Sequence, residues 1–173
     1  MSDASDRDDD RVTVPPGACV GGRFDVVAHA GSGGVGSVYR AVERDTGRTV
    51  ALKLLHAGSE GEARFAREAD VLASLEHPGI VRYLAFGEAE GGASYLAMEW
   101  IDGLDLERRL RRGPVTPSEA VALARAVADA LAFAHARGVV HRDLKPANLV
   151  LVDGRFDAAK IVDFGLALPA EDV

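Results

Sequence analysis

The sequence contains one cysteine, Cys19, among its 173 residues. A single cysteine cannot form an intramolecular disulfide or a cysteine-based zinc site, so we expect a reducing compartment. No apolar run reaches the roughly 18 residues that a membrane-spanning helix needs, and the first residues lack the apolar segment of a signal peptide. These absences predict a cytoplasmic protein without a membrane span.

Positive charge is also scarce relative to negative charge. The chain has 20 Lys and Arg against 27 Asp and Glu, a formal net charge of −7. This balance disfavours attraction to nucleic acid or anionic lipid, so any bound anion must be held by a local site. Five Asp lie within residues 1–11, which have few apolar side chains. We therefore expect residues 1–20 to form a disordered acidic tail and linker.

The apolar pattern from residue 21 onward predicts a small antiparallel sheet. Short runs rich in β-branched and aromatic residues are separated by turn signals such as Asp45-Thr46-Gly47. After the third run, Ser59 and Glu62 form a capping-box pattern that predicts the start of a helix. Five strands are expected, at residues 24–30, 37–42, 49–55, 80–86 and 94–100.

Beyond the fifth strand the pattern becomes helical. A short helix is expected over residues 104–112 and a long one over residues 116–137, which opens with a second capping box. Because apolar residues occupy most of its circumference, the long helix is expected to be buried on more than one side. The chain is thus predicted to be an α+β protein, with a mainly helical part at residues 103–173.

A glycine cluster follows the first predicted strand. Gly31, Gly33, Gly36 and Val38 match the spacing G-x-G-x-x-G-x-V, which lets backbone amides approach phosphates without Cβ atoms in the way. A ligand-free turn and a dinucleotide-binding fold are alternatives. The dinucleotide motif requires the third glycine to open a helix, whereas residues 37–42 continue as a strand. The context favours a glycine-rich hairpin folded over a nucleotide.

Lys53 lies within a very apolar strand. A lysine is unfavourable there unless it meets an anion, although an edge lysine that reaches water is the simpler alternative. Glu68 falls on the apolar stripe of the predicted helix, three residues after Phe65, and a surface pair with Arg64 is its alternative role. We expect an ion pair between Lys53 and Glu68.

The most specific motif is HRDLKPAN at residues 141–148, which lies between apolar segments. Asp143 could orient or deprotonate an attacking hydroxyl, and Lys145 could neutralise the charge of a transferring phosphoryl group. Asn148 could ligate a divalent cation. An apolar strand then ends in D-F-G, where Asp163 would be a second oxygen ligand for the metal. In isolation, that tripeptide could equally be a simple turn at the end of a strand.

Together these motifs resemble the eukaryotic-like, Hanks-type protein kinases. The glycine loop, the V-A-x-K strand, the HRDLKPAN loop and D-F-G occur in that family's order, from about Arg23 to the end of the chain. The loop form with Lys145 is similar to Ser/Thr kinases, and the sequence around the glycines looks like the bacterial branch.

The resemblance implies a protein-kinase-like α+β fold. Residues 21–102 would form a five-stranded small lobe with one helix and the hinge, and residues 103–173 a partial, mainly helical large lobe. The implied reaction is transfer of the ATP γ-phosphoryl group to a Ser or Thr hydroxyl of a protein substrate.

The resemblance also implies how the chain would hold ATP. The glycines would cover the phosphates, Lys53 would contact the α- and β-phosphates, and Met98 would be the gatekeeper beside the adenine. The Glu99 carbonyl and the Ile101 amide would be hinge contacts, with Asp105 near the ribose. The implied nucleotide-binding residues are Gly31, Gly33, Gly36, Val38, Ala51, Lys53, Met98, Glu99, Ile101, Asp105 and Val150.

Catalytic and metal-binding roles follow from the same resemblance. Asp143 would be the catalytic base, while Asn148 and Asp163 would carry Mg²⁺ or Mn²⁺. The implied catalytic set is Asp143, Lys145, Lys53 and Glu68. A four-residue stack that matches the family's regulatory spine would assemble when the helix carrying Glu68 is in place, and its members are Leu72, Tyr83, His141 and Phe164.

The sequence ends at Val173, shortly after the D-F-G tripeptide. The resemblance implies that an activation segment, an A-P-E motif and further helices belong beyond this point, so we expect the leading part of a truncated kinase. One alternative is a non-catalytic fragment that binds nucleotide or a partner kinase through an intact small lobe. Exposed large-lobe surface could also bind a partner kinase or a second copy of the chain. A small-molecule phosphotransferase of the aminoglycoside type is a weaker alternative, disfavoured by Lys145.

Overall fold

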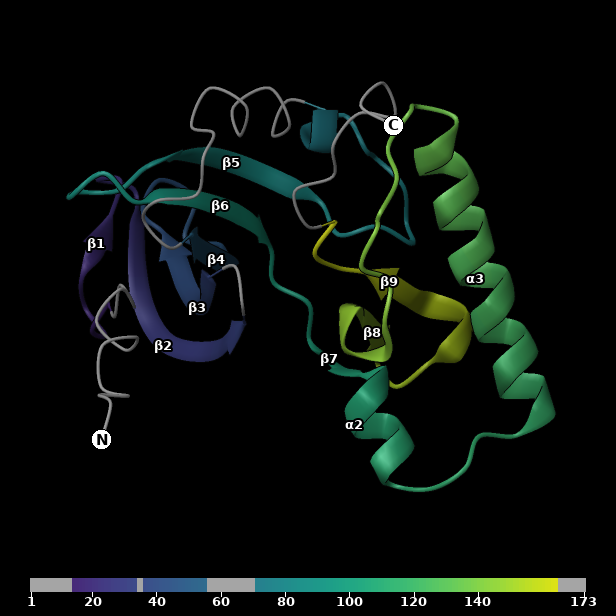
Figure 1. Ribbon diagram of the computed structural model, residues 1–173. Coiled ribbons are helices and arrows are strands. Elements are labelled where there is room, and N and C mark those ends of the chain that lie inside the picture. Colours follow the sequence, from purple (N-terminus) through teal and green to yellow (C-terminus); the bar gives the residue numbers. More distant parts are fainter. Residues whose placement is uncertain (1–13, 34–35, 56–70, 165–173) are drawn as a thin grey trace, which may run out of the picture. The chain divides into compact units, whose positions relative to one another are not determined.

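The protein forms two compact units in a computed structural model (Figure 1). The model describes residues 14–33, 36–55 and 71–164. By its contacts the chain divides into residues 1–66 with 84–100, the first unit, and residues 67–83 with 101–173, the second unit. The predicted domain boundaries at residues 20 and 102 stay predictions.

The first unit is built on a six-stranded sheet with the strand order β1-β2-β3-β4-β6-β5. Its strands are β1 (Cys19–Val20), β2 (Phe24–Gly33), β3 (Gly36–Glu43), β4 (Thr49–Leu55), β5 (Tyr83–Glu88) and β6 (Ser94–Glu99). The pairs β1–β2, β2–β3, β3–β4 and β4–β6 are antiparallel. The five expected strands are present, but the predicted strand number was wrong by one. The two residues of β1 are too few to produce an alternating pattern.

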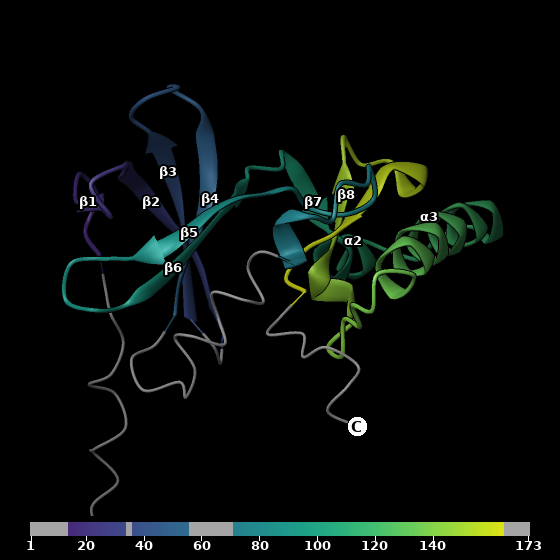
Figure 2. The same cartoon turned by 90° about the horizontal axis from the view of Figure 1, so that it is seen from above.

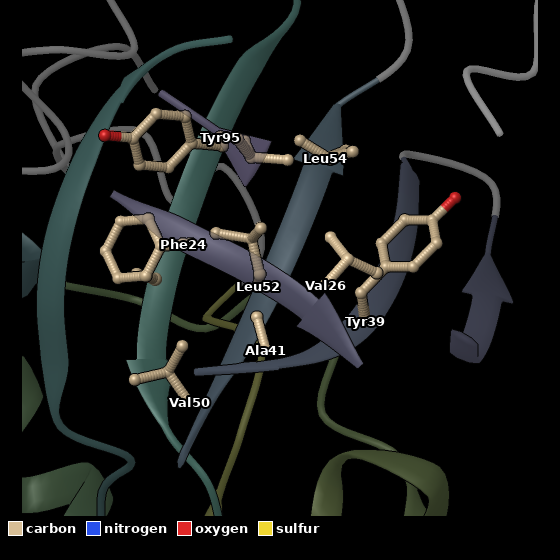
Figure 3. Close-up of a cluster of buried hydrophobic side chains, with 10 residues drawn as sticks. Phe24, Val26, Tyr39, Ala41, Val50, Leu52, Leu54 and Tyr95 are labelled. Carbon is tan, nitrogen blue, oxygen red and sulfur yellow. The ribbon is translucent and has the colours of Figure 1, made fainter. Parts of the chain in front are cut away.

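The core of the first unit lies on one face of this sheet. In Figure 3, the side chains of Val50, Leu52 and Leu54 from β4 gather with those of neighbouring strands in one apolar cluster. The ring of Phe24 meets that of Tyr95 edge-on, with 5.6 Å between ring centroids. Because side chains alternate along a strand, the remaining residues of β4 face the opposite side of the sheet.

The second unit contains a three-stranded antiparallel sheet in the order β7-β8-β9. Its strands are β7 (Gly103–Asp105), β8 (Leu149–Val152) and β9 (Ala159–Ile161), and its described helices are α2 (Leu106–Arg111), α3 (Pro117–His135) and the 3-10 helices η1 (Pro146–Asn148) and η2 (Phe156–Ala158). The helix expected over residues 104–112 is shorter than predicted. Its first two residues belong to β7, because Leu104 and Asp105 pair with β8.

Helix α3 begins with the predicted capping box. Thr116 Oγ1 accepts a hydrogen bond from Glu119 N at 3.3 Å, and the Glu119 carboxylate accepts one from Thr116 N at 2.7 Å. The helix packs against β9 and η2 (Figure 2).

The predicted burial of α3 on more than one side was wrong for the described residues. Its buried residues are Ala130 and Ala134, whereas Val121 is 52% exposed. Apolar composition around a helix favours burial only where other elements pack against it, and β9 and η2 cover one side. In the part of the chain that the structure describes, no helix is both long and apolar enough to cross a membrane.

Candidate active site

The glycine cluster lies in the hairpin between β2 and β3. Gly33 pairs with Gly36 across the two strands. A Cβ atom added at Gly31 or Gly33 would meet nothing within 4 Å, whereas one at Gly36 would overlap the backbone carbonyl of Leu54 in β4. Gly36 is therefore required by the close approach of β3 and β4, while Gly31 and Gly33 leave free space that a ligand could use.

Polar side chains connect the two strands of this hairpin. Ser32 lies opposite Ser37, and their hydroxyl oxygens are 3.2 Å apart. His29 Nε2 lies 2.9 Å from Ser32 Oγ, and its ring meets the Tyr39 ring edge-on. These hydrogen bonds were not predicted from the sequence, because the contact of Ser32 with Ser37 depends on how the two strands pair. They brace the hairpin on the core side of the sheet, where Tyr39 is buried.

The residues predicted to contact adenine and phosphates share the opposite face of the sheet. Val38 pairs with Lys53 across β3 and β4, and Ala51 pairs with Met98 across β4 and β6. Residues that pair directly across antiparallel strands have side chains on the same face. Lys53 and Met98 are buried, and Val38 and Ala51 are half-buried. The sheet thus brings these four predicted residues together.

Lys53 is 7% exposed. Its predicted partner Glu68 lies outside the described residues, as do Phe65 and Arg64, so the ion pair stays a prediction. The alternative of an edge lysine that reaches water does not fit such burial, because an ammonium group that snorkels to solvent remains accessible. Burial of the charged side chain keeps the expectation of an anionic partner in force.

The predicted hinge residue Glu99 is half-buried and lies opposite Val50 at the end of β6. The guanidinium of Arg40 lies over the ring of the next residue, Trp100, with its Cζ 5.4 Å from the ring centroid. This cation–π contact fixes the tryptophan against β3. This contact was not predicted from the sequence, because Arg40 and Trp100 are 60 positions apart and such a contact leaves no local pattern.

In the second unit, Ile101 is half-buried and Asp105 pairs with Val150 across β7 and β8. The Asp105 carboxylate also caps α2. It accepts a hydrogen bond from Arg108 N at 2.7 Å and pairs with the Arg108 guanidinium at 3.2 Å. Asp105 therefore has a structural role that the sequence analysis did not assign, beside the expected position near the ribose.

The HRDLKPAN loop brings its three predicted functional side chains together. Lys145 Nζ donates to Asp143 Oδ2 at 2.6 Å, and Asn148 Nδ2 donates to Asp143 O at 2.8 Å and to its Oδ2 at 3.3 Å. The Lys145 ammonium lowers the pKa of Asp143, and the Asp143 carboxylate raises the pKa of Lys145. Both groups are charged at neutral pH and exposed to solvent, so the carboxylate is accessible to an incoming substrate.

Hydrogen bonds of His141 and Asn148 connect the loop to Val162, the residue before Asp163. The backbone of Arg142, between His141 and Asp143, is left-handed with a φ of 60°. Asp143 N donates to His141 Nδ1 at 3.3 Å, so the ring proton lies on Nε2, which is 3.2 Å from the Val162 carbonyl. Burial lowers the pKa of His141 and keeps the ring neutral. Val162 N in turn donates to Asn148 O at 2.9 Å.

These contacts bring the segment before Asp163 against Asn148. The amide nitrogen of Asn148 is engaged by Asp143, so its amide oxygen is the atom that remains to coordinate a cation. An amide oxygen and a carboxylate are ligands that suit Mg²⁺ or Mn²⁺. Among the described residues no group of three or more His, Cys, Asp or Glu could hold a metal by itself.

Three of the four predicted stack residues are in contact. The rings of His141 and Phe164 lie 4.7 Å apart, and Phe164 N donates to the Tyr83 hydroxyl at 3.2 Å. Burial, with the nearby Asp163 carboxylate, raises the pKa of Tyr83, so the phenol stays protonated. Leu72 is buried as well. Tyr83 was predicted as a member of the stack, but the hydrogen bond that its hydroxyl accepts was not foreseen.

The chain is similar to proteins of one family. A family model described as the protein kinase domain matches residues 24–172. The serine/threonine-protein kinase pkn2 of Myxococcus xanthus is 40% identical over 159 residues, which is 89% of this chain and 19% of that protein. PkaA of Streptomyces coelicolor, also a serine/threonine-protein kinase, is 43% identical over 169 residues, which is 88% of this chain and 31% of that protein.

Solved structures agree with these similarities. The crystal structure of the Mycobacterium tuberculosis PknI kinase domain aligns with a TM-score of 0.78 and 34% identity, over 90% of this chain and 62% of that chain. A structure of Rad53 in complex with AMP-PNP aligns with a TM-score of 0.75 and 34% identity, over 83% of this chain and 38% of that chain. The chain thus spans less than two thirds of each of these proteins.

Proposed function

The chain belongs to the protein kinase domain family, with bacterial serine/threonine kinases among its relatives, and we propose that it carries the nucleotide-binding and phosphoryl-transfer residues of such a kinase. The observation that carries the proposal is the hydrogen-bonded group of Asp143, Lys145 and Asn148, in which an ionised, exposed carboxylate is fixed from two sides. Packing alone does not require such an arrangement. The protein substrate, a signalling role and a cytoplasmic location are parts of the proposal.

In this reaction the Asp143 carboxylate binds the Ser or Thr hydroxyl of the substrate. The carboxylate orients the hydroxyl and accepts its proton, the hydroxyl oxygen forms a bond to the γ-phosphorus of ATP, and the bond to the leaving ADP oxygen breaks. The ammonium of Lys145, held beside Asp143, stabilises the negative charge on the transferring phosphoryl group. Asp143 is ionised at neutral pH, as an ordinary aspartate is, and the Lys145 ammonium lowers its pKa further.

The nucleotide would be held by the face of the six-stranded sheet that carries Val38, Ala51, Lys53 and Met98. Gly31 and Gly33 leave space for phosphates, and Lys53 would hold them electrostatically. Family membership implies the use of ATP and a divalent metal, and the related Rad53 structure contains AMP-PNP.

Asn148 and Asp163 would hold Mg²⁺ or Mn²⁺. The ion supplies positive charge that neutralises the phosphate oxygens. The protein's contribution is the fixed amide of Asn148, since its nitrogen is already bound to Asp143.

Transfer of radiolabel from [γ-³²P]ATP to a Ser/Thr peptide library tests the proposal, using this chain and the full-length product of its gene. We expect labelled phosphoserine or phosphothreonine that Asp143→Asn abolishes. Asp153→Asn is the matched control, since Asp153 is an exposed turn residue with a φ of 52°, a conformation that Asn also adopts. Nucleotide binding without transfer in both proteins would favour the non-catalytic alternative. Transfer that survives Asp143→Asn would contradict the assignment.

A further inference from the structure

A buried tyrosine hydroxyl contacts the backbone immediately after the predicted metal ligand. Tyr83 is the first residue of β5, and its hydroxyl accepts a hydrogen bond from Phe164 N at 3.2 Å. The two residues are 81 positions apart, and both are buried. Leaving a buried backbone amide without a hydrogen-bond partner costs free energy.

The residue between these fixed points has an unusual backbone. Asp163 has a φ of 57°, in the left-handed region that residues with a Cβ adopt infrequently. On its N-terminal side, Val162 is held by both backbone groups, through Asn148 O at 2.9 Å and His141 Nε2 at 3.2 Å. On its C-terminal side, the Phe164 N–H donates to the Tyr83 hydroxyl.

We infer that the Tyr83 hydroxyl is a positioning group for Asp163. By fixing the Phe164 amide, it holds the peptide plane that follows Asp163 and keeps this residue in its left-handed conformation. The carboxylate is then presented in one orientation before metal and nucleotide arrive. The inference rests on the proposed function, in which Asp163 carries the divalent cation.

The hydroxyl is separable from the ring. Aromatic contact between His141 and Phe164, with 4.7 Å between ring centroids, does not involve the Tyr83 oxygen. A stack of apolar side chains needs the volume of the Tyr83 ring and not its oxygen. Tyr83→Phe therefore removes the hydrogen bond while it keeps the ring.

Hydrogen exchange followed by NMR tests the bond directly in this chain. In the unmodified protein we expect the Phe164 amide to be protected, and in Tyr83→Phe to exchange about fivefold faster or more, the factor expected for loss of one neutral hydrogen bond. The Ile161 amide, which donates to Gly79 O at 2.8 Å, is the internal reference and should change little. The Asp163 N–H to Hα coupling should move away from its left-handed value in the variant.

Tyr39→Phe is the matched control. Tyr39→Phe also removes a tyrosine hydroxyl that accepts a hydrogen bond from a backbone amide, that of Val14 at 3.1 Å. Tyr39 lies in the core of the six-stranded sheet, in a cluster that does not include Phe164. This variant should leave Phe164 exchange and the Asp163 coupling unchanged. Equal effects of the two variants on Phe164 would indicate general loosening and would overturn the inference.

The functional consequence is measured by nucleotide affinity with and without metal. In Tyr83→Phe, the ratio of the ATP dissociation constant in EDTA to that in Mg²⁺ should fall about fivefold. The ATP affinity in EDTA should stay within about twofold of that of the unmodified chain. In Asp163→Asn, the ratio should fall to about one, because the metal no longer strengthens binding. A purely structural tyrosine would change both affinities together.

The outcomes distinguish failure of the proposed function from failure of the positioning role of the Tyr83 hydroxyl. If the unmodified chain shows no Mg²⁺-dependent nucleotide binding, the proposed function fails, and Phe164 exchange with the Asp163 coupling still decides whether the hydroxyl fixes this backbone. An unprotected Phe164 amide in the unmodified chain overturns the inference even if the variant does not fold. If Tyr83→Phe changes the Asp163 N–H to Hα coupling but leaves the EDTA-to-Mg²⁺ ratio of ATP dissociation constants unchanged, the metal-positioning role is overturned as well.

Discussion

Asp143 combines an exposed carboxylate with two fixed neighbours. Lys145 supplies a charge at 2.6 Å, and the buried Asn148 ties the carboxylate to the backbone of the same loop. The Lys145 hydrogen bond is the main reason for the lowered pKa of Asp143, and the Asn148 hydrogen bond contributes less. Because the pair is exposed, its role lies in charge and orientation rather than in stability.

Lys145→Met is therefore expected to raise the pKa of Asp143 towards its ordinary value. In the proposed role Asp143 accepts a proton only when ionised, so the acidic limb of the kcat/KM profile should shift to higher pH in the variant. The lowered pKa of Asp143 in the folded state also contributes stability at neutral pH, and this contribution is lost as the pH falls through that pKa. NMR titration of the Asp143 carboxyl carbon measures the shift directly. An unchanged pKa in Lys145→Met would contradict the assigned cause.

Among the structural elements, the glycine hairpin separates two uses of glycine. Gly36 is excluded from carrying a side chain by the Leu54 carbonyl of β4, whereas the space around Gly33 is open. The sequence motif treats these positions alike. Their difference arises because Gly36 is already within the paired part of β3 and β4.

We expect Gly36→Ala to lower the free energy of unfolding by about 1–3 kcal/mol, since the added methyl group forces the two strands apart. Gly33→Ala should leave stability within about 0.5 kcal/mol and weaken ATP binding instead. Urea denaturation and ATP titration of both variants measure the two effects. Equal destabilisation by the two substitutions would be inconsistent with the open space at Gly33.

At the scale of the whole molecule, residues 77–82 belong to the second unit by their contacts, although they lead directly into β5 of the six-stranded sheet. Ile161 N donates to Gly79 O at 2.8 Å, and Val81 N donates to Ile161 O at 2.9 Å. His77 adds side-chain contacts, accepting from Gly79 N at 3.0 Å and lying 3.2 Å from Asp129 of α3.

His77→Ala should lower the free energy of unfolding of the second unit by about 1–2 kcal/mol, because the side-chain bond to Gly79 and the contact with Asp129 are both lost. The Val81 and Ile161 amides should exchange faster. His135→Ala removes an exposed histidine of α3 and serves as the control. If both variants behave alike in exchange and denaturation, the His77 contacts do not hold this segment.

Sequence patterns were most informative where the signal is local. The capping box at Thr116 and the strand at residues 49–55 were predicted with the bounds that the structure has, because caps and strand alternation depend on neighbours within four residues. Two-residue β1 and the exposure of α3 were not foreseen. Both depend on which other elements pack nearby, and periodicity alone carries no such information.

The sequence by itself determined the family and the order of the motifs, since fixed spacings such as HRDLKPAN and G-x-G-x-x-G specify chemistry within a few residues. Only the tertiary structure decided that Gly36 is a packing requirement and that the Tyr83 hydroxyl meets Phe164 N. It also decided that residues 77–81 pack with β9. The physical reason is that a hydrogen bond or a close approach between residues far apart in the chain depends on how the backbone folds, and no local pattern of side chains encodes it.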